Sequence, residues 1–304
     1  MELLKRVLTA LVLIPIVLLL VLRAPAAVLV FVVAVVALLA IRELLKLSEA
    51  YGIRPLQTAT YIFAGIFFVL IAFSSGPTPA ISTSGFAFIS LSAAALAPFI
   101  FLVVAMRREE LASAYPAAGA SAFAFVYIAL PMACLAQIRG QWEGSFYLLY
   151  LLLLVWAGDI FAYFVGKSVG THRMSPRVSP NKTWEGAIAS VIASIAVGML
   201  MFHYAVPISI ALLRAHLIER RDGVFSEPHS LIPIVVLSII LNIAAQLGDL
   251  VESLIKRGAG AKDSGAILPG HGGMFDRIDA LLFAAPVLWS YMAYHVLVEA
   301  NFVN

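Results

Sequence analysis

The residues best suited to chemistry are the charged side chains gathered in residues 246–279. This segment holds five of the seventeen acids and four of the twenty Lys and Arg residues, in a chain with only 12% charged residues. They are Asp249, Glu252, Asp263, Asp276, Asp279, Lys256, Arg257, Lys262 and Arg277. Because the flanking segments are apolar, such charges are costly unless they bind something. Mg²⁺ prefers one or two carboxylates plus phosphate oxygens, so the segment suits a divalent metal and a polyphosphate.

Two helix ends and a loop should position these groups. At about 100° per residue, five polar side chains fall within an arc of roughly 80° on one helix. They are Asn242, Gln246, Asp249, Ser253 and Lys256. A glycine-dense loop, 258–273, follows, and its glycines permit backbone N–H groups to approach a ligand closely. Asp276 and Asp279 then share a face at the start of the next apolar run, which predicts a metal site between two helices.

Each of these residues also has a simpler structural explanation. Asp is favoured at a helix N-cap and in the first turn, so Asp276 or Asp279 could cap a helix. A single interfacial Lys or Arg often extends to the membrane surface, although four together exceed that need. Ser253 could donate to a phosphate or bond back into its own helix. His271 fits a phosphate contact, a proton donor or a loop-packing residue.

Over 27 residues this segment resembles the signature of the phosphatidate cytidylyltransferases, also called CDP-diacylglycerol synthases. The matching residues read Ser253-x-Ile255-Lys256-Arg257, Lys262-Asp263-x-Gly265, Leu268-Pro269-x-His271-Gly272-Gly273-Met274 and Asp276-Arg277-Ile278-Asp279. A second block, 179–186, reads Ser-Pro-Asn-Lys-Thr-Trp-Glu-Gly and is similar to another stretch of that family. The resemblance is specific over roughly residues 156–279, whereas the first 140 residues agree only in being membrane helices.

The resemblance implies transfer of CMP from CTP to phosphatidate, which gives CDP-diacylglycerol and pyrophosphate. It implies Mg²⁺, or Mn²⁺, at Asp249 and Asp276 with Asp279 close by, a second, monovalent cation such as K⁺, and a homodimer. The expected catalytic residues are Asp249, Asp276, Asp279, Lys256 and Lys262. The expected substrate-binding residues are Asp159, Ser179, Lys182, Thr183, Glu185, Ser253, Arg257, His271, Gly272, Gly273 and Arg277.

The expected substrate-binding residues between Asp159 and Glu185 also have alternative explanations. Asp159 interrupts an apolar run, which indicates either a site facing a cavity or a partner, or a buried ion pair with Lys167 or another loop cation. The basic loop 167–185 suits the substrate, or simple attraction to anionic lipid head groups. Thr183 and Glu185 precede an apolar run, so they are also expected to help begin a helix.

The composition predicts an all-α, polytopic integral membrane protein, since 62% of the residues are hydrophobic. Apolar runs long enough to span a bilayer occur at 7–22, 24–41, 58–73, 86–106, 118–137, 146–166, 186–206, 231–251 and 280–298, which makes nine. Residues 208–217 could add an interfacial helix. We divide the chain into family-variable membrane helices, 1–140, and a catalytic part, 141–304.

The distribution of Lys and Arg predicts which side of the membrane the motifs face. With the N-terminus inside, fifteen of the twenty fall on the cytoplasmic side, together with both motif loops. Lys5 and Arg6 before an apolar run also imitate a signal peptide, but the further runs favour a retained first helix of an inner-membrane protein. The one cysteine, Cys134, lies in an apolar run and is expected to be structural.

Two other functions fit part of the pattern. A transporter also carries intramembrane acids, but typically near the midplane and often with paired repeats. Another CTP-using lipid enzyme, such as a polyprenol kinase, would release CDP instead of pyrophosphate. The net charge of +3 is small for the length, so nucleic acid is not expected. The motif lacks a Ser-His-Asp or Cys-His set, which favours in-line transfer without a covalent intermediate.

Overall fold

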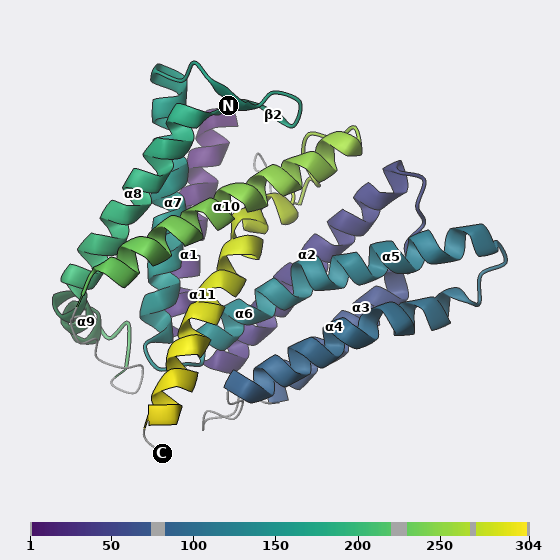
Figure 1. Cartoon of the computed structure of the whole chain (residues 1–304), viewed down its shortest axis with the longest axis horizontal. Coiled ribbons are helices and arrows are strands. Elements are labelled where there is room, and N and C mark those ends of the chain that lie inside the picture. The colour runs from purple at the N-terminus through teal and green to yellow at the C-terminus, as the bar shows by residue number, and fades with distance from the viewer. Residues whose placement is uncertain (1, 74–82, 220–229, 268–271, 303–304) are drawn as a thin grey trace.

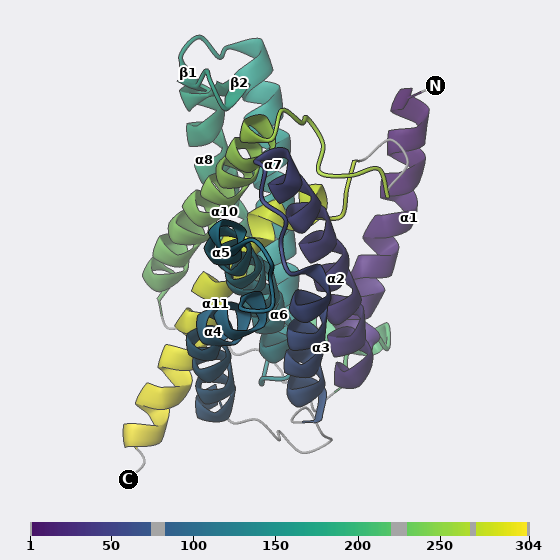
Figure 2. The same cartoon turned by 90° about the vertical axis from the view of Figure 1, so that its right-hand side faces the viewer.

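The protein is an all-α bundle with one small β-hairpin, as Figures 1 and 2 show in two views. The computed structural model describes residues 2–73, 83–219, 230–267 and 272–302. The elements are α1 (Glu2–Arg23), α2 (Ala26–Ala50), α3 (Gln57–Phe73), α4 (Thr83–Ala105), η1 (Leu111–Ser113), α5 (Ala114–Ala124), η2 (Phe125–Ala129), α6 (Leu130–Arg139), α7 (Gly144–Ser168), β1 (Arg173–Ser175), β2 (Ser179–Thr183), α8 (Trp184–His203), α9 (Ala205–Arg214), α10 (Ile232–Gly258) and α11 (Phe275–Phe302). The predicted fold class is therefore confirmed.

All nine predicted apolar runs contain helix, but fewer of them meet the requirements of a membrane span. Six helical stretches of the described chain are long and apolar enough: α2, α4, the continuous stretch Leu111–Arg139, α7, α8 and α10. The segment Leu11–Arg23 of α1, for which side chains are described, is shorter, and so are helices α3 and α9. The protein is thus an integral membrane protein by its helices, while the predicted count of nine spans is not confirmed. α9 forms where residues 208–217 suggested an additional helix.

Helix α10 holds the two motif blocks together, because it packs against both α8 and α11. Its predicted polar stripe lies along α8. Asn242 Nδ2 donates to Ser190 Oγ and to Ser194 Oγ, each at 2.8 Å. Gln246 Nε2 continues the stripe by donating to Ala187 O at 3.3 Å. Unsatisfied polar groups are costly in an apolar environment, so these bonds fix how α10 lies along α8.

Helices α10 and α11 approach each other closely beside the predicted site. Gly248 permits this, because a Cβ there would overlap the backbone oxygen of Asp279 on α11. Asp249 directly follows Gly248 in the chain. The crossing point therefore brings carboxylates of two helices together.

Residues 167–185, for which the sequence predicted only a basic loop, contain the antiparallel hairpin β1–β2. Arg173 lies opposite Thr183, and Ser175 lies opposite Ser179. Thr183 is the N-cap of α8 and its Oγ1 accepts from Gly186 N at 3.2 Å, which confirms its predicted role in beginning that helix. The hairpin and the C-terminal end of α10 lie toward the same end of the bundle, whereas α11 ends at the opposite end (Figures 1 and 2).

Helix α2 connects the N-terminal helices with the site-bearing ones. It packs against α3, α6 and α11, and Ala37, Ile41 and Leu44 are on its buried face. The predicted apolar run ended at residue 41, yet α2 continues to Ala50. The charged residues of this last part remain helical, and one of them, Glu43, is buried.

Candidate active site

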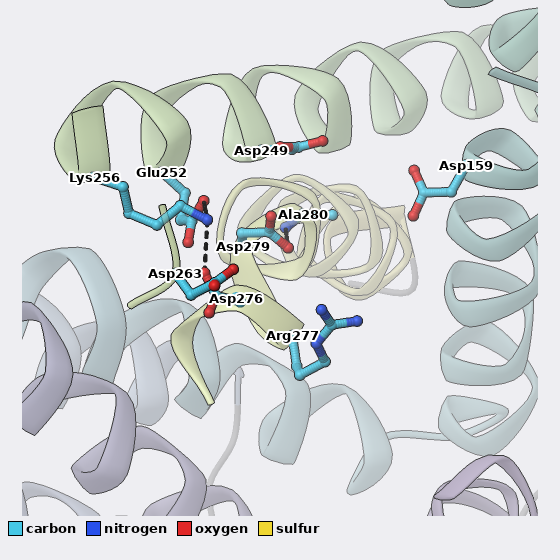
Figure 3. A pocket seen from close by; sticks show the side chains of 9 residues that line it. All are labelled: Asp159, Asp249, Glu252, Lys256, Asp263, Asp276, Arg277, Asp279 and Ala280. Carbon is cyan, nitrogen blue, oxygen red and sulfur yellow. Dashed lines mark hydrogen bonds and ion pairs between the residues drawn. The ribbon is translucent and has the colours of Figure 1, made fainter. Parts of the chain in front are cut away.

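A polar cavity of about 300 Å³ lies where α7, α10 and α11 face one another (Figure 3). Its lining residues are Asp159, Asp249, Glu252, Lys256, Asp263, Asp276, Arg277, Asp279 and Ala280. Six of these nine are acids and two are basic. The cavity thus carries an excess of negative charge, which suits a cation.

Three of the carboxylates are close enough to share one cation. Asp249 and Glu252 on α10 and Asp279 on α11 offer oxygen atoms that all lie within 4.8 Å of one another. The Glu252 side chain is 1% exposed, and its Oε1 has no hydrogen-bond partner in the described part of the chain. Carboxylates held this close repel one another unless a cation offsets their charge. The three residues therefore fit Mg²⁺, a cation that takes oxygen ligands, and the metal itself stays a prediction.

Lys256 joins this cluster to Asp276. Its Nζ lies 2.6 Å from Glu252 Oε2 and 2.6 Å from Asp276 Oδ1. Asp276 Oδ2 also accepts from Gly273 N at 2.7 Å and from Ser264 N at 3.0 Å. Charge-assisted bonds of this kind are stronger than neutral ones, so Asp276 holds the loop before α11 against the end of α10.

The predicted metal ligands Asp249, Asp276 and Asp279 all line one cavity, but their partners differ. The three-carboxylate cluster contains Glu252, whereas Asp276 is bonded to Lys256 and to loop N–H groups. Sequence reasoning did not name Glu252 as a site residue. Its spacing could have identified it, because it stands three residues after Asp249 and four before Lys256, on the same side of the helix.

The second motif block reaches the cavity through the hairpin. Lys182 Nζ on β2 lies 2.5 Å from Asp249 Oδ2. Glu185 instead faces the loop, where its Oε1 accepts from Thr171 Oγ1 at 2.8 Å and lies 2.7 Å from His172 Nδ1. Within the second motif block, Lys182 pairs with Asp249 of the acidic cluster, whereas Glu185 contacts the residues that precede β1.

The polar residues at the end of α10 have local partners in the structure. Ser253 Oγ donates to Asp249 Oδ1 at 3.4 Å, a bond back into its own helix. Arg257 is exposed and its Nη1 donates to Ala261 O at 3.1 Å. Lys262 is also exposed. Their predicted contacts with phosphate groups stay predictions.

The remaining predicted residues lie on α7, at the start of α11 and in the loop before it. Asp159 and Arg277 line the cavity. Gly272 has φ +77°, and a side chain there would overlap the carboxylate of Asp276, so both the backbone and the space require glycine. His271 falls within 268–271, outside the described residues.

An apolar groove of about 290 Å³ lies beside α11 on the same side as Asp279. Its lining residues are Phe123, Val126, Tyr127, Pro131, Leu282, Phe283 and Pro286. Phe283 follows Asp279 by four residues, which puts both on one face of the helix. The Tyr127 ring lies edge-on to Phe283, with ring centroids 6.1 Å apart, and belongs to the π-helical turn η2. Such turns are frequent at functional sites.

Comparisons with known proteins identify the family of this chain. The Cytidylyltransferase family model matches residues 4–295. The chain is similar to the phosphatidate cytidylyltransferase of Brucella abortus biovar 1 (strain 9-941), with 39% identity over 180 residues, which is 59% of this chain and 57% of the relative. The proteins of the same name from Haemophilus influenzae (36% identity, 51% of this chain and 48% of the relative) and Staphylococcus saprophyticus (39%, 53% and 54%) are also similar.

The chain spans about half the length of these curated relatives, whereas the family match covers nearly all of it. The resemblance carried by the two motif blocks is thereby confirmed. From the match across residues 4–295, the chain belongs to the cytidylyltransferase family.

Proposed function

We propose that this protein transfers CMP from CTP to phosphatidate, forming CDP-diacylglycerol and releasing pyrophosphate. The observation that carries the proposal is the cavity between α10 and α11, where three carboxylates meet beside Lys256 and Lys182. The names of the relatives supply the substrate class, and the family supplies the type of reaction. Figure 3 shows the side chains that would surround the reacting groups.

The obstacle in this reaction is charge, because two phosphate-bearing molecules must approach each other. Asp249, Glu252 and Asp279 would hold Mg²⁺, which when bound supplies positive charge that offsets the charge of the phosphates. Lys256 and Arg277 line the cavity and are the chain's own groups for binding phosphate oxygens. The bonds from Lys256 to Glu252 and Asp276 keep its ammonium group in place before substrate arrives.

The transfer itself needs no strong base from the protein. A phosphate monoester has a second pKa of about 6, so the phosphate of phosphatidate is largely ionised at neutral pH. One of its oxygens forms a bond to the α-phosphorus of CTP, while the bond from that phosphorus to the bridging β-phosphate oxygen breaks. Pyrophosphate leaves with the electron pair. No Ser, Cys or His stands among the described residues lining the cavity, which supports direct transfer by alignment.

The lipid part of the substrate would occupy the apolar groove beside α11. Phosphatidate has a charged head group and apolar chains, so its enzyme needs a polar site continuous with an apolar surface. Asp279 belongs to the cavity and Phe283, one turn later, belongs to the groove. We therefore assign the groove to an acyl chain next to the head group.

The cavity is proposed to face the cytoplasm, where CTP is found. Fifteen of the twenty Lys and Arg residues fall on one side in the sequence-based topology, and both motif blocks belong to that side. The ion pair between Lys182 and Asp249 supports a common side for the two blocks. A homodimer and a bound monovalent cation stay expectations from the resemblance.

A direct assay tests the function. The purified protein in detergent is given labelled CTP and phosphatidic acid, with Mg²⁺ or with excess EDTA, and both products are identified. We expect labelled CDP-diacylglycerol and one pyrophosphate per lipid, with no product in EDTA or without phosphatidic acid. Release of CDP together with a phosphorylated lipid would point to a kinase of the polyprenol type. Absence of any lipid product would reject the proposal.

A further inference from the structure

Glu43, on the N-terminal helix α2, is a buried acid, and no pattern in the sequence places it near the site. It is 5% exposed and lies between apolar residues of the same helix, with Ile41 0% and Leu44 3% exposed. A carboxylate taken out of water is costly unless its oxygens are hydrogen-bonded. The partners of Glu43 therefore explain why it is tolerated there.

In the described part of the chain, the Glu43 carboxylate accepts three hydrogen bonds, all from the loop before α11 or from the first residue of α11. Oε2 accepts from Phe275 N at 2.8 Å and from Ser264 Oγ at 3.0 Å, and Oε1 accepts from Met274 N at 3.1 Å. Phe275 is the first residue of α11. The first N–H groups of a helix lack partners within the helix and favour a negative charge, so Glu43 caps α11 from another part of the chain.

The loop is shaped around this carboxylate. A Cβ at Gly265 or at Gly273 would overlap the side chain of Glu43. Two of the glycines in the motif are thus required by space for a residue more than 200 positions earlier. The fit is specific to a side chain of this length and charge at position 43.

The same loop atoms lead from Glu43 to the cavity. Ser264 donates through Oγ to Glu43 and through its backbone N to Asp276. Asp276 in turn pairs with Lys256, which pairs with Glu252 of the acidic cluster. A continuous set of hydrogen bonds and ion pairs therefore runs from α2 to the cluster.

We propose that Glu43 is a positioning residue for the active site: it fixes the start of α11 and thereby holds Asp276 and Asp279 against α10. This inference rests on the proposed function of the cavity. Glu43 is absent from the cavity lining, so it acts through the residues it holds. Groups that orient metal ligands typically contribute about 10- to 100-fold to metal affinity or activity.

The test compares Glu43→Gln with the parent. The amide keeps the size of the side chain but carries no charge, and it cannot accept at both terminal atoms. We expect kcat to fall about 10- to 100-fold, with a matching rise in the Mg²⁺ concentration for half-maximal activity. Amide hydrogen exchange in micelles should become faster at Met274 and Phe275. If Glu43 only stabilised the fold, the variant would give a lower yield or a lower melting temperature. The variant protein that does fold would then keep the parent's Mg²⁺ dependence.

Glu49→Gln is the matched control. Glu49 lies on the same helix, is exposed, and its Oε1 accepts from Gln57 Nε2 at 2.9 Å, a bond that the amide oxygen can still accept. We expect parent values for this variant. If Glu43→Gln does not fold, Ser264→Ala removes a single donor to Glu43 and should shift the Mg²⁺ dependence in the same direction by a smaller factor.

The inference would be overturned if Glu43→Gln kept the parent's kcat, Mg²⁺ dependence and amide exchange. If Glu43→Gln does not fold, a Ser264→Ala variant with the parent's Mg²⁺ dependence would overturn it. A parent chain that makes no CDP-diacylglycerol would reject the proposed function instead. In that case the exchange rates at Met274 and Phe275 still decide whether Glu43 fixes the start of α11.

Discussion

Glu252 and Asp276 both pair with Lys256, yet their other surroundings differ. Asp276 is bonded on both oxygens by loop and lysine donors, whereas Glu252 Oε1 has no hydrogen-bond partner in the described chain. Glu252 also belongs to the three-carboxylate cluster with Asp249 and Asp279. A buried carboxyl oxygen without a hydrogen-bond partner gains most from a bound cation. The structure therefore adds Glu252 to the residues that would bind Mg²⁺.

Replacing Glu252 by Gln tests this assignment. The amide preserves the shape of the side chain but removes the charge offered to a cation. We expect the Mg²⁺ concentration for half-maximal activity to rise by more than the roughly 10- to 100-fold that loss of a supporting residue costs. A Mg²⁺ titration of labelled-lipid formation measures it. An unchanged titration would mean that Glu252 serves only to pair with Lys256.

The predicted residues that line the cavity are those whose signal in the sequence is local. Asp249, Asp276 and Asp279 were found because helical spacing and the motif place them near helix ends, and all of them line the cavity. Glu43 could not be found in this way. Its partners stand 221 to 232 residues further along the chain, and no periodic pattern within α2 indicates a bond at that distance.

Among the elements, α10 was the easiest to predict and the hairpin the hardest. The polar stripe of α10 follows helical periodicity, and Asn242 and Gln246 contact α8 as that stripe requires. Strands β1 and β2 are short, polar and without alternating apolar residues, so the usual strand signal is missing. Helix α2 continues past residue 41, where its predicted apolar run ends, and Glu43 in this continuation is bonded by distant partners.

The crossing of α10 and α11 at Gly248 should tolerate no side chain. In Gly248→Ala, the new Cβ would overlap the backbone oxygen of Asp279 and push the two helices apart. Overpacking of this kind typically costs about 1–3 kcal/mol, and it would also separate Asp279 from Asp249. We expect a lower melting temperature in detergent together with a large loss of activity.

Gly119→Ala on α5 is the control for this change, because nothing lies within 4 Å of a Cβ at that position. Ala is favoured over Gly inside a helix by about 0.5–1 kcal/mol, so stability should stay the same or rise slightly. Equal behaviour of the two variants in the melting and activity assays would show that the close approach at Gly248 is unimportant.

The apolar groove gives a separate prediction about the lipid. Val126 lines the groove and is 40% exposed, so Val126→Trp should fill space assigned to an acyl chain. We expect kcat/KM to fall for long-chain phosphatidate more than for a short-chain analogue, with the KM for CTP unchanged. Val103→Trp on α4, 65% exposed and outside the groove, should behave like the parent. A loss that is equal for both lipids would argue against the groove as the chain site.

For the whole molecule, the sequence correctly predicted an all-α membrane protein and a helix within each apolar run. It did not establish how many helices cross the bilayer, because crossing depends on length and on which faces are covered by protein. Six helical stretches of the described chain are long and apolar enough to span, whereas α3 and α9 are shorter. The assignment of the hairpin and the end of α10 to one end of the bundle is independent of that count (Figures 1 and 2).

The proposed orientation in the membrane can be measured with single cysteines. Cys134 is the one natural cysteine and is buried, so Cys134→Ala provides the background. Arg177→Cys lies in the hairpin turn, and Trp142→Cys, at a position 65% exposed, lies between α6 and α7. A membrane-impermeant maleimide is added to intact right-side-out membrane vesicles. Since the basic loops should face inward, Trp142→Cys should react at once and Arg177→Cys only after permeabilisation. The reverse pattern would put the cavity on the side without CTP and would contradict the proposed function as well as the topology.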